Sequence, residues 1–343
     1  MPMLSVRTCI EAHWQHPKWW LTIGLWPLSR LFQTISALRR GWYRWGWQKT
    51  QRLPCPVVVV GNLHVGGVGK TPLVASLAEA LRTRGILVGI ISRGYGRQSH
   101  DTLLLKEGSR PEEVGDEPLM LWRQTGVPVA VGRKRYDAGM LLLQAHPEIQ
   151  LIICDDGLQH YALAREMELV VFPAADVGRA IDVLPNGPLR EPLVRLAGVD
   201  ALLLSQGNDD AVARARQLFR LPETVYCAAT QIQPEVVYAL NAPKRVLCPK
   251  DCEGQTVAAV AGIGRPDRFF NTLRSLGWPL GETKVLPDHA QIQAADLPAA
   301  DVVLVTEKDA VKLAGQDLPH VWVLKIMVSL PPILLDKIEQ RCC

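Results

Sequence analysis

Short runs of apolar, mostly β-branched residues alternate along this chain with stretches in which apolar residues recur at helical spacing. Continuous apolar runs are typical of strands buried on both faces, and intervening helices indicate a parallel sheet covered on both sides. The pattern therefore predicts an α/β fold. Strands are expected at 57–60, 86–91, 127–131, 151–154, 169–172 and 201–204, and helices at 72–84, 118–125 and 133–145.

The pattern changes near residue 223, where two extended stretches at 224–227 and 235–240 replace the alternation of strands and helices. A second α/β series follows, with strands at 257–261, 302–305 and 321–326 and a helix near 267–276. We therefore expect four parts. They are a helical segment at 1–50, a larger α/β domain at 51–222, a two-stranded linker at 223–243 and a smaller α/β domain at 244–343.

The first strand runs directly into a glycine-rich turn that ends in Gly-Lys-Thr, and a helical pattern follows. This order builds a phosphate-binding loop, in which backbone N–H groups and a helix N-terminus face an anion. It predicts a P-loop NTPase-like domain that binds a nucleotide, although His64 stands where the usual pattern has glycine. Lys70 would reach the β- and γ-phosphates, and the Thr71 hydroxyl would bind Mg²⁺. The candidate nucleotide-binding residues are His64, Val65, Gly66, Gly67, Val68, Gly69, Lys70 and Thr71.

A second signal comes where the apolar run at 151–154 ends in Asp155 and Asp156. An acidic residue at the end of a buried strand, downstream of a P-loop, commonly holds Mg²⁺ against the phosphates. The pattern does not decide which of the two aspartates does so, and an ordinary Asp-Asp-Gly turn is the alternative. Gln159 and His160 follow closely and are candidates for contacting substrate.

Other polar positions lie in predicted loops and allow two interpretations each. Arg93 and Arg97 suit phosphate or sugar recognition, or form a solvated turn. Asp116 opens a predicted helix, so it is either a helix N-cap or a catalytic carboxylate. Arg190 and Glu191 could reach a phosphate and a metal ion, or lie in a surface loop.

The smaller domain offers one candidate of its own. His289 follows Asp288, and this pair could tune a carboxylate base across a cleft between the domains, or could simply lie on the surface.

The first 52 residues differ in composition from the rest. They hold eight Lys and Arg against a single acid, Glu11, and the first 47 hold seven of the ten tryptophans. Tryptophan with basic residues is typical of a membrane interface that faces an anionic leaflet. The apolar part around 19–26 is short, so we expect a helix that lies in or partly inserts into the membrane face. An amphipathic helix packed on the body is the alternative.

Two further classes are disfavoured for this segment. A cleaved signal peptide would place its basic residues before the apolar part, and here they follow it. Nucleic-acid binding is a weaker interpretation because the aromatic residues cluster on apolar runs. The eight cysteines form no Cys-x-x-Cys pair, so a zinc site is not expected. We expect the chain to reside in a reducing cytoplasm.

Taken together, these motifs resemble the tetraacyldisaccharide 4′-kinase family, the lipid A kinases of Gram-negative bacteria. The similarity spans most of the chain, from the N-terminal segment through the phosphate-binding loop to the motif at 306–312. The shared segments are 61–72, 93–96, 115–118, 155–160, 189–192, 287–289 and 306–312.

The resemblance implies an enzyme at the cytoplasmic face of the inner membrane that uses ATP and Mg²⁺. Its acceptor would be the 4′-hydroxyl of a lipid A disaccharide 1-phosphate. By the same resemblance Asp116 is the general base and His289 its partner, and the metal residues are Thr71, Asp155, Asp156 and Glu191. We expect a monomer without a nucleic-acid partner. A membrane-associated P-loop ATPase or regulator without a lipid substrate is the rival interpretation.

Overall fold

The structure is a computed structural model and describes residues 6–287, 290 and 292–342. Its strands join in one thirteen-stranded sheet with the order β11-β10-β12-β13-β8-β7-β6-β1-β5-β2-β4-β3, and β9 pairs with β8 beside this path. The strands are β1 Val57–Asn62, β2 Val88–Ser92, β3 Leu103–Leu104, β4 Val129–Val131, β5 Leu151–Asp155, β6 Met167–Pro173, β7 Ala201–Ser205, β8 Tyr226–Ala239, β9 Ala242–Leu247, β10 Val257–Ala261, β11 Leu280–Val285, β12 Val302–Thr306 and β13 Val321–Ser329.

Ten α-helices and four short 3₁₀ turns connect these strands within the described residues. The 3₁₀ turns are Ala174–Asp176, Leu193–Gly198, Pro249–Cys252 and Ala294–Asp296. The helices are α1 Val6–Gln15, α2 Trp19–Arg44, α3 Lys70–Thr83, α4 Pro111–Val114, α5 Asp116–Thr125, α6 Arg135–Ala145, α7 Asp209–Leu218, α8 Pro266–Ser275, α9 Glu307–Leu313 and α10 Pro332–Cys342.

The larger part of the sheet carries the phosphate-binding loop. Strands β7, β6, β1, β5, β2 and β4 run parallel to one another, and all six residues of β1 are buried. Alternate side chains of β1 enter two cores: Val58 packs with α3, α5 and α10, whereas Val59 packs with α6 and α7. The predicted parallel sheet with helices on both faces is confirmed, and it brings the carboxyl ends of β1, β2 and β5 to one edge.

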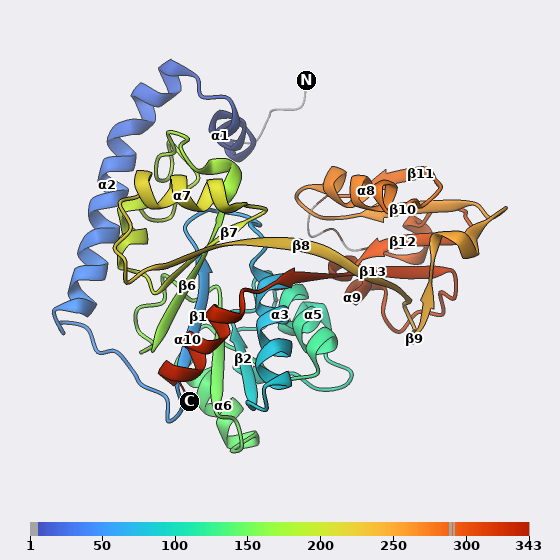
Figure 1. Ribbon diagram of the computed structural model, residues 1–343, viewed down its shortest axis with the longest axis horizontal. Helices are drawn as coiled ribbons and strands as arrows, with labels where there is room; N and C mark the ends of the chain where they lie inside the picture. Colours follow the sequence, from blue (N-terminus) through green and yellow to red (C-terminus); the bar gives the residue numbers. More distant parts are fainter. Residues whose placement is uncertain (1–5, 288–289, 291, 343) are drawn as a thin grey trace.

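The smaller part of the sheet is a second α/β unit. Strands β11, β10, β12 and β13 are parallel to one another, with α8 packed on one face and α9 on the other. Figure 1 shows this unit at one end of the molecule and α2 at the opposite side. The predicted strands at 257–261, 302–305 and 321–326 all lie within observed strands.

A single long strand, β8, joins the two units. Its first part pairs in parallel with β7, and its second part pairs antiparallel with β13. The two extended stretches predicted at 224–227 and 235–240 thus fall mostly within one strand, followed by β9 at Ala242–Leu247. Pro234 lies within β8 where its pairing with β13 shifts register, and such irregular positions tolerate proline.

Helix α2 packs on the larger unit through one face only. The Ser29 hydroxyl is completely buried, donates to the Val183 carbonyl at 3.0 Å and accepts from the Asn186 N–H. Arg30 forms an ion pair with Asp182. Among the described residues, none of the helices combines the length and apolar content that a membrane crossing needs. The packed-helix alternative therefore describes one face of α2.

Candidate functional site

The loop between β1 and α3 has the backbone of a phosphate-binding loop. Gly66 and Gly69 have φ of 101° and 90°, a region that residues with a Cβ seldom adopt. Gly69 caps α3, which begins at Lys70. In the described chain the N–H groups of residues 66–69 donate to no backbone carbonyl. Together with the first turn of α3, they are available to bind an anion.

Two of the predicted loop residues face elsewhere. The His64 side chain is buried, with Nε2 3.1 Å from Asp176 Oδ2 and its ring against Phe172. The Val65 N–H donates to the Pro188 carbonyl at 2.8 Å, so a neighbouring loop already uses it. The histidine fits because its side chain points away from the interior of the loop.

Lys70 lies between two strand ends. Its Nζ is buried, 3.1 Å from Asn62 Oδ1 at the end of β1 and 3.5 Å from Asp156 Oδ1 after β5. Asn62 was not predicted to be a site residue, although it lies in the shared segment 61–72. The signal that was missed is a polar residue closing a fully buried apolar strand, where an unpaired amide would be costly.

Asp155 is buried and only partly hydrogen-bonded. Its Oδ2 accepts from the Ser92 hydroxyl at 3.1 Å, while Oδ1 has no hydrogen-bond partner in the described structure. Burial, then Glu117 and Asp156, raise the pKa of Asp155 to about 7. A buried carboxylate oxygen without a donor suits a cation, so this residue fits a metal ligand.

The Asp156 carboxylate lies between two basic residues. It adopts φ of 48°, and Arg190 Nη1 lies 3.0 Å and 3.1 Å from its two carboxylate oxygens. Burial alone would raise the pKa of Asp156, but Lys70 and Arg190 hold it below its usual value. The two neighbouring aspartates therefore differ in pKa, as paired acidic groups often do.

Glu191, a predicted metal ligand, is engaged by neighbouring side chains. Its carboxylate accepts from the Tyr161 hydroxyl, from Gln159 Nε2 at 3.3 Å and from Arg40 Nη1 of α2 at 3.5 Å. These contacts hold the Glu191 carboxylate at this edge of the site, and its role as a metal ligand stays a prediction. In the described part of the chain, no three His, Cys, Asp or Glu side chains converge as a metal site.

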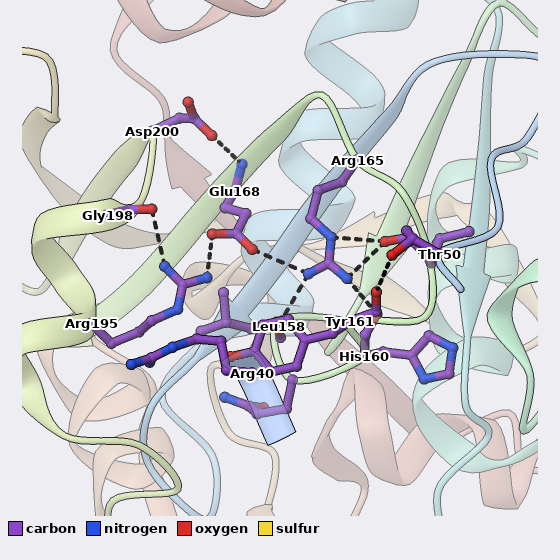
Figure 2. Close-up of polar contacts among 12 residues, drawn as sticks. Arg40, Thr50, Leu158, His160, Tyr161, Arg165, Glu168, Arg195, Gly198 and Asp200 are labelled. Atoms are coloured by element: carbon purple, nitrogen blue, oxygen red, sulfur yellow. Dashed lines mark hydrogen bonds and ion pairs between the residues drawn. The ribbon is translucent and has the colours of Figure 1, made fainter. Parts of the chain in front are cut away.

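A network of buried ion pairs continues from Glu191. Figure 2 shows Glu168 between Arg165 and Arg195, and the Glu168 N–H donates to Asp200 at 2.8 Å.

Burial, then Arg135 and Arg165, lower the pKa of His160 to about 4, so its imidazole is neutral at pH 7. His160 is therefore available as a neutral hydrogen-bonding group rather than as a cation.

Asp116 is the first residue of α5, and Gly115 caps the helix with φ of 95°. The N-cap interpretation of Asp116 is therefore replaced by a first-turn position, with its side chain 18% exposed. Lys312 Nζ of α9 lies 3.8 Å from Asp116 Oδ2. His289, the predicted partner of Asp116, lies outside the described residues, so this pairing stays a prediction.

The site combines a parallel sheet, a glycine-rich loop leading into a helix, a buried lysine and strand-end aspartates. Together, these features define the class of P-loop phosphotransferases. A family model described as "Tetraacyldisaccharide-1-P 4'-kinase" matches residues 21–343. The chain belongs to this family. It is accordingly a kinase of lipid A biosynthesis, as the resemblance implied.

Similar proteins cover nearly the whole chain. The tetraacyldisaccharide 4'-kinase of Neisseria meningitidis serogroup B is 51% identical over 337 residues, which cover 98% of this chain and 96% of that protein. The one from Chromobacterium violaceum is 44% identical and covers 97% of each. The crystal structure of LpxK from Aquifex aeolicus in complex with ATP has a TM-score of 0.77 and 31% identity, covering 94% of this chain and all of that one.

Proposed function

We propose that this chain binds ATP in the loop at 64–71 and transfers its γ-phosphate to the 4′-hydroxyl of a tetraacyldisaccharide 1-phosphate. The observation that carries the proposal is Lys70, which is the first residue of α3 and is buried beside Asp156. A lysine there can neutralise charge on the transferring phosphate. The related A. aeolicus structure, in complex with ATP, supports the nucleotide.

The nucleotide phosphates would contact backbone more than side chains. A Cβ added at Gly66 or Gly67 would meet no atom within 4 Å, so space lies open over the loop. We assign the cradle to the N–H groups of residues 66–71 and the buried ammonium of Lys70. Val65 and His64 hold the loop from outside, through Pro188 and Asp176.

Mg²⁺ would be held by Thr71, Asp155 and Asp156. Asp155 has the unpartnered oxygen that a cation needs, and Thr71 stands in the first turn of α3. When bound, Mg²⁺ neutralises charge on the β- and γ-phosphates. Glu191 acts in this proposal by fixing Gln159 and Tyr161, and Arg190 keeps the Asp156 carboxylate oriented.

The acceptor hydroxyl needs a group that takes its proton. We assign this role to Asp116, with His289 as its partner by similarity to the family. Transfer of a phosphoryl group depends mainly on positioning and on neutralising charge, so this base acts late and contributes about 10²–10⁴-fold.

Access to a lipid acceptor would come through α2. Its outward face exposes apolar and aromatic side chains, while basic residues lie beside them, as in helices that bind anionic membrane surfaces. We propose peripheral association with the cytoplasmic face of the inner membrane, in a protein that acts as a monomer. The exposed stripe consists of Trp20, Ile23, Leu31, Ile35, Leu38 and Trp42.

The direct test follows the γ-phosphate. ATP labelled in the γ-position is incubated with the purified chain, Mg²⁺ and the tetraacyldisaccharide 1-phosphate in detergent micelles. We expect label in the lipid, dependent on acceptor. Release of free phosphate without labelled lipid would instead support the rival P-loop ATPase.

A further inference from the structure

The motif at 306–312 has no role in the site described so far, although two of its acids are buried. It forms the end of β12 and the short helix α9, whose Thr306 side chain accepts from the Asp309 N–H at 3.2 Å. Glu307 and Asp309 are both buried. Because buried charges are costly, each needs a specific partner.

Asp309 is fixed by its own unit. It is fully buried, and its Oδ2 accepts from the Gly262 N–H at 3.0 Å and from the Thr306 hydroxyl at 2.7 Å. These donors follow β10 and close β12, two neighbouring strands of the smaller unit. The position of the Asp309 carboxylate therefore follows the position of that unit.

Lys312 connects this carboxylate to the larger unit. Its side chain is 5% exposed, and Nζ lies 3.6 Å from Asp309 Oδ1 and 3.8 Å from Asp116 Oδ2. Within the described residues Nζ has no hydrogen-bond partner, so the two carboxylates are the charges that compensate its burial. A lysine held between one fixed anion and another restricts where the second anion can lie.

The helices that carry these groups are also tied at the other end. Arg123 Nη1 of α5 donates to the Val311 carbonyl at 3.3 Å, and Gln124 Nε2 reaches the Ile326 carbonyl of β13 at 3.5 Å. One contact with α9 and one with β13 at this end, and an ion pair at the other, fix the direction of α5 against the smaller unit. Asp116, at the first turn of α5, is positioned by that arrangement.

We propose that Lys312 is a positioning residue for Asp116, which it ties to Asp309 so that the carboxylate stays aimed at the acceptor hydroxyl. The inference rests on the base role of Asp116 in the proposed function. Lys312 itself touches neither the nucleotide loop nor the strand-end aspartates in the described contacts. Losing it should therefore affect phosphoryl transfer and not ATP binding.

A double-mutant cycle tests this. Lys312→Met keeps most of the length of the side chain and removes its charge, and we expect kcat to fall about 10- to 100-fold while KM for ATP changes less than about twofold. Asp116→Asn should lower kcat more. In the Asp116→Asn background, Lys312→Met should have almost no further effect on kcat, because its influence passes through Asp116.

The matched control is Lys325→Met. Lys325 also bridges the two units, with Nζ 3.4 Å from Glu79 of α3, but it makes no described contact with Asp116. The kcat of the Lys325→Met variant should stay within about twofold of wild type. If Lys312→Met does not fold, as judged by thermal unfolding, Asp309→Asn replaces it in the cycle with the same expectation.

Two outcomes overturn the proposal, and they are distinguishable. Losses that multiply in the double mutant would show that Lys312 acts independently of Asp116. An Asp116→Asn variant with wild-type kcat would instead remove the base role on which the inference rests, and the inference would fall with it.

Discussion

His64 illustrates how a residue can occupy a phosphate-binding loop without contacting phosphate. The usual phosphate-binding pattern has glycine at this position, and the structure accommodates histidine by burying it against Phe172 and Asp176. Its imidazole takes part in holding the loop 174–176, while its backbone follows β1. The side chain therefore contributes to stability more than to binding.

The corresponding prediction concerns His64→Ala. Removing the buried ring leaves a cavity and takes from the Asp176 carboxylate one of its partners, although Arg179 remains, so the free energy of unfolding should fall by about 1–3 kcal/mol. KM for ATP should rise less than about threefold. Urea unfolding and steady-state kinetics measure the two quantities, and a large rise in KM with unchanged stability would contradict the orientation of the side chain.

Glu307 is buried beside Lys325 and accepts from the Ile326 N–H at 3.2 Å. Burial raises its pKa to about 7. The folded state therefore holds the proton more strongly than the unfolded chain. The stability from this group is fully present below about pH 4.5 and is lost as the pH rises through about 7.

Glu307→Gln removes this titration and keeps an oxygen for the Ile326 N–H. Relative to wild type, the variant should gain up to about 3 kcal/mol of unfolding free energy between pH 4.5 and pH 8. Urea unfolding at both pH values measures the change. Glu235→Gln, at an exposed neighbour of the same lysine, is the control, and a pH-independent difference for Glu307→Gln would contradict the account.

The site was only partly predictable from sequence. Local order identified Lys70 and the strand-end aspartates, because a strand, a loop and a helix fix them within a few residues. The engagement of Val65 by Pro188, and of Glu191 by Arg40, depends on segments more than a hundred residues apart. No local pattern encodes such pairings.

Helix α2 has two faces with different tasks. Ser29 and Arg30 dock it on the loop that follows β6, and that same loop contacts the phosphate-binding loop through Pro188. The opposite face exposes a continuous apolar stripe, for example Trp20, which is 56% exposed. One short segment of chain therefore connects α2 to the phosphate-binding loop.

Membrane binding should depend on this stripe. Replacing Leu31, Ile35 and Leu38 together by serine removes apolar area that lies outside the core, so folding should be retained while binding to anionic vesicles falls about tenfold or more. Vesicle co-sedimentation measures it. The control replaces Leu218, Leu276 and Ile333, which are exposed on other helices or their ends, by serine. Equal binding by both triple variants would contradict the role of α2.

The arrangement of the two units follows from β8. Its second part pairs with β13. This pairing places residues 231–239 beside residues 322–329, which are distant in the sequence. Helix α3, which begins at the phosphate-binding loop, also reaches β13, because the Ser76 hydroxyl accepts from the Val328 N–H at 2.8 Å. Sequence periodicity predicted each unit, but not this continuous sheet, because strand pairing over such separations leaves no local signature.

In the proposed mechanism, groups from both units meet at one edge of the sheet. Asp116, the proposed general base, comes from the larger unit, and Lys312 from the smaller unit lies beside it.

The most direct measurement is kcat for transfer of the γ-phosphate to the lipid acceptor by Asp116→Asn. The account predicts a fall of about 10²–10⁴-fold, with KM for ATP within about twofold of wild type. Asp137→Asn, at an exposed first-turn aspartate of α6, is the matched control and should keep its activity. An Asp116→Asn enzyme with unchanged kcat would contradict the account.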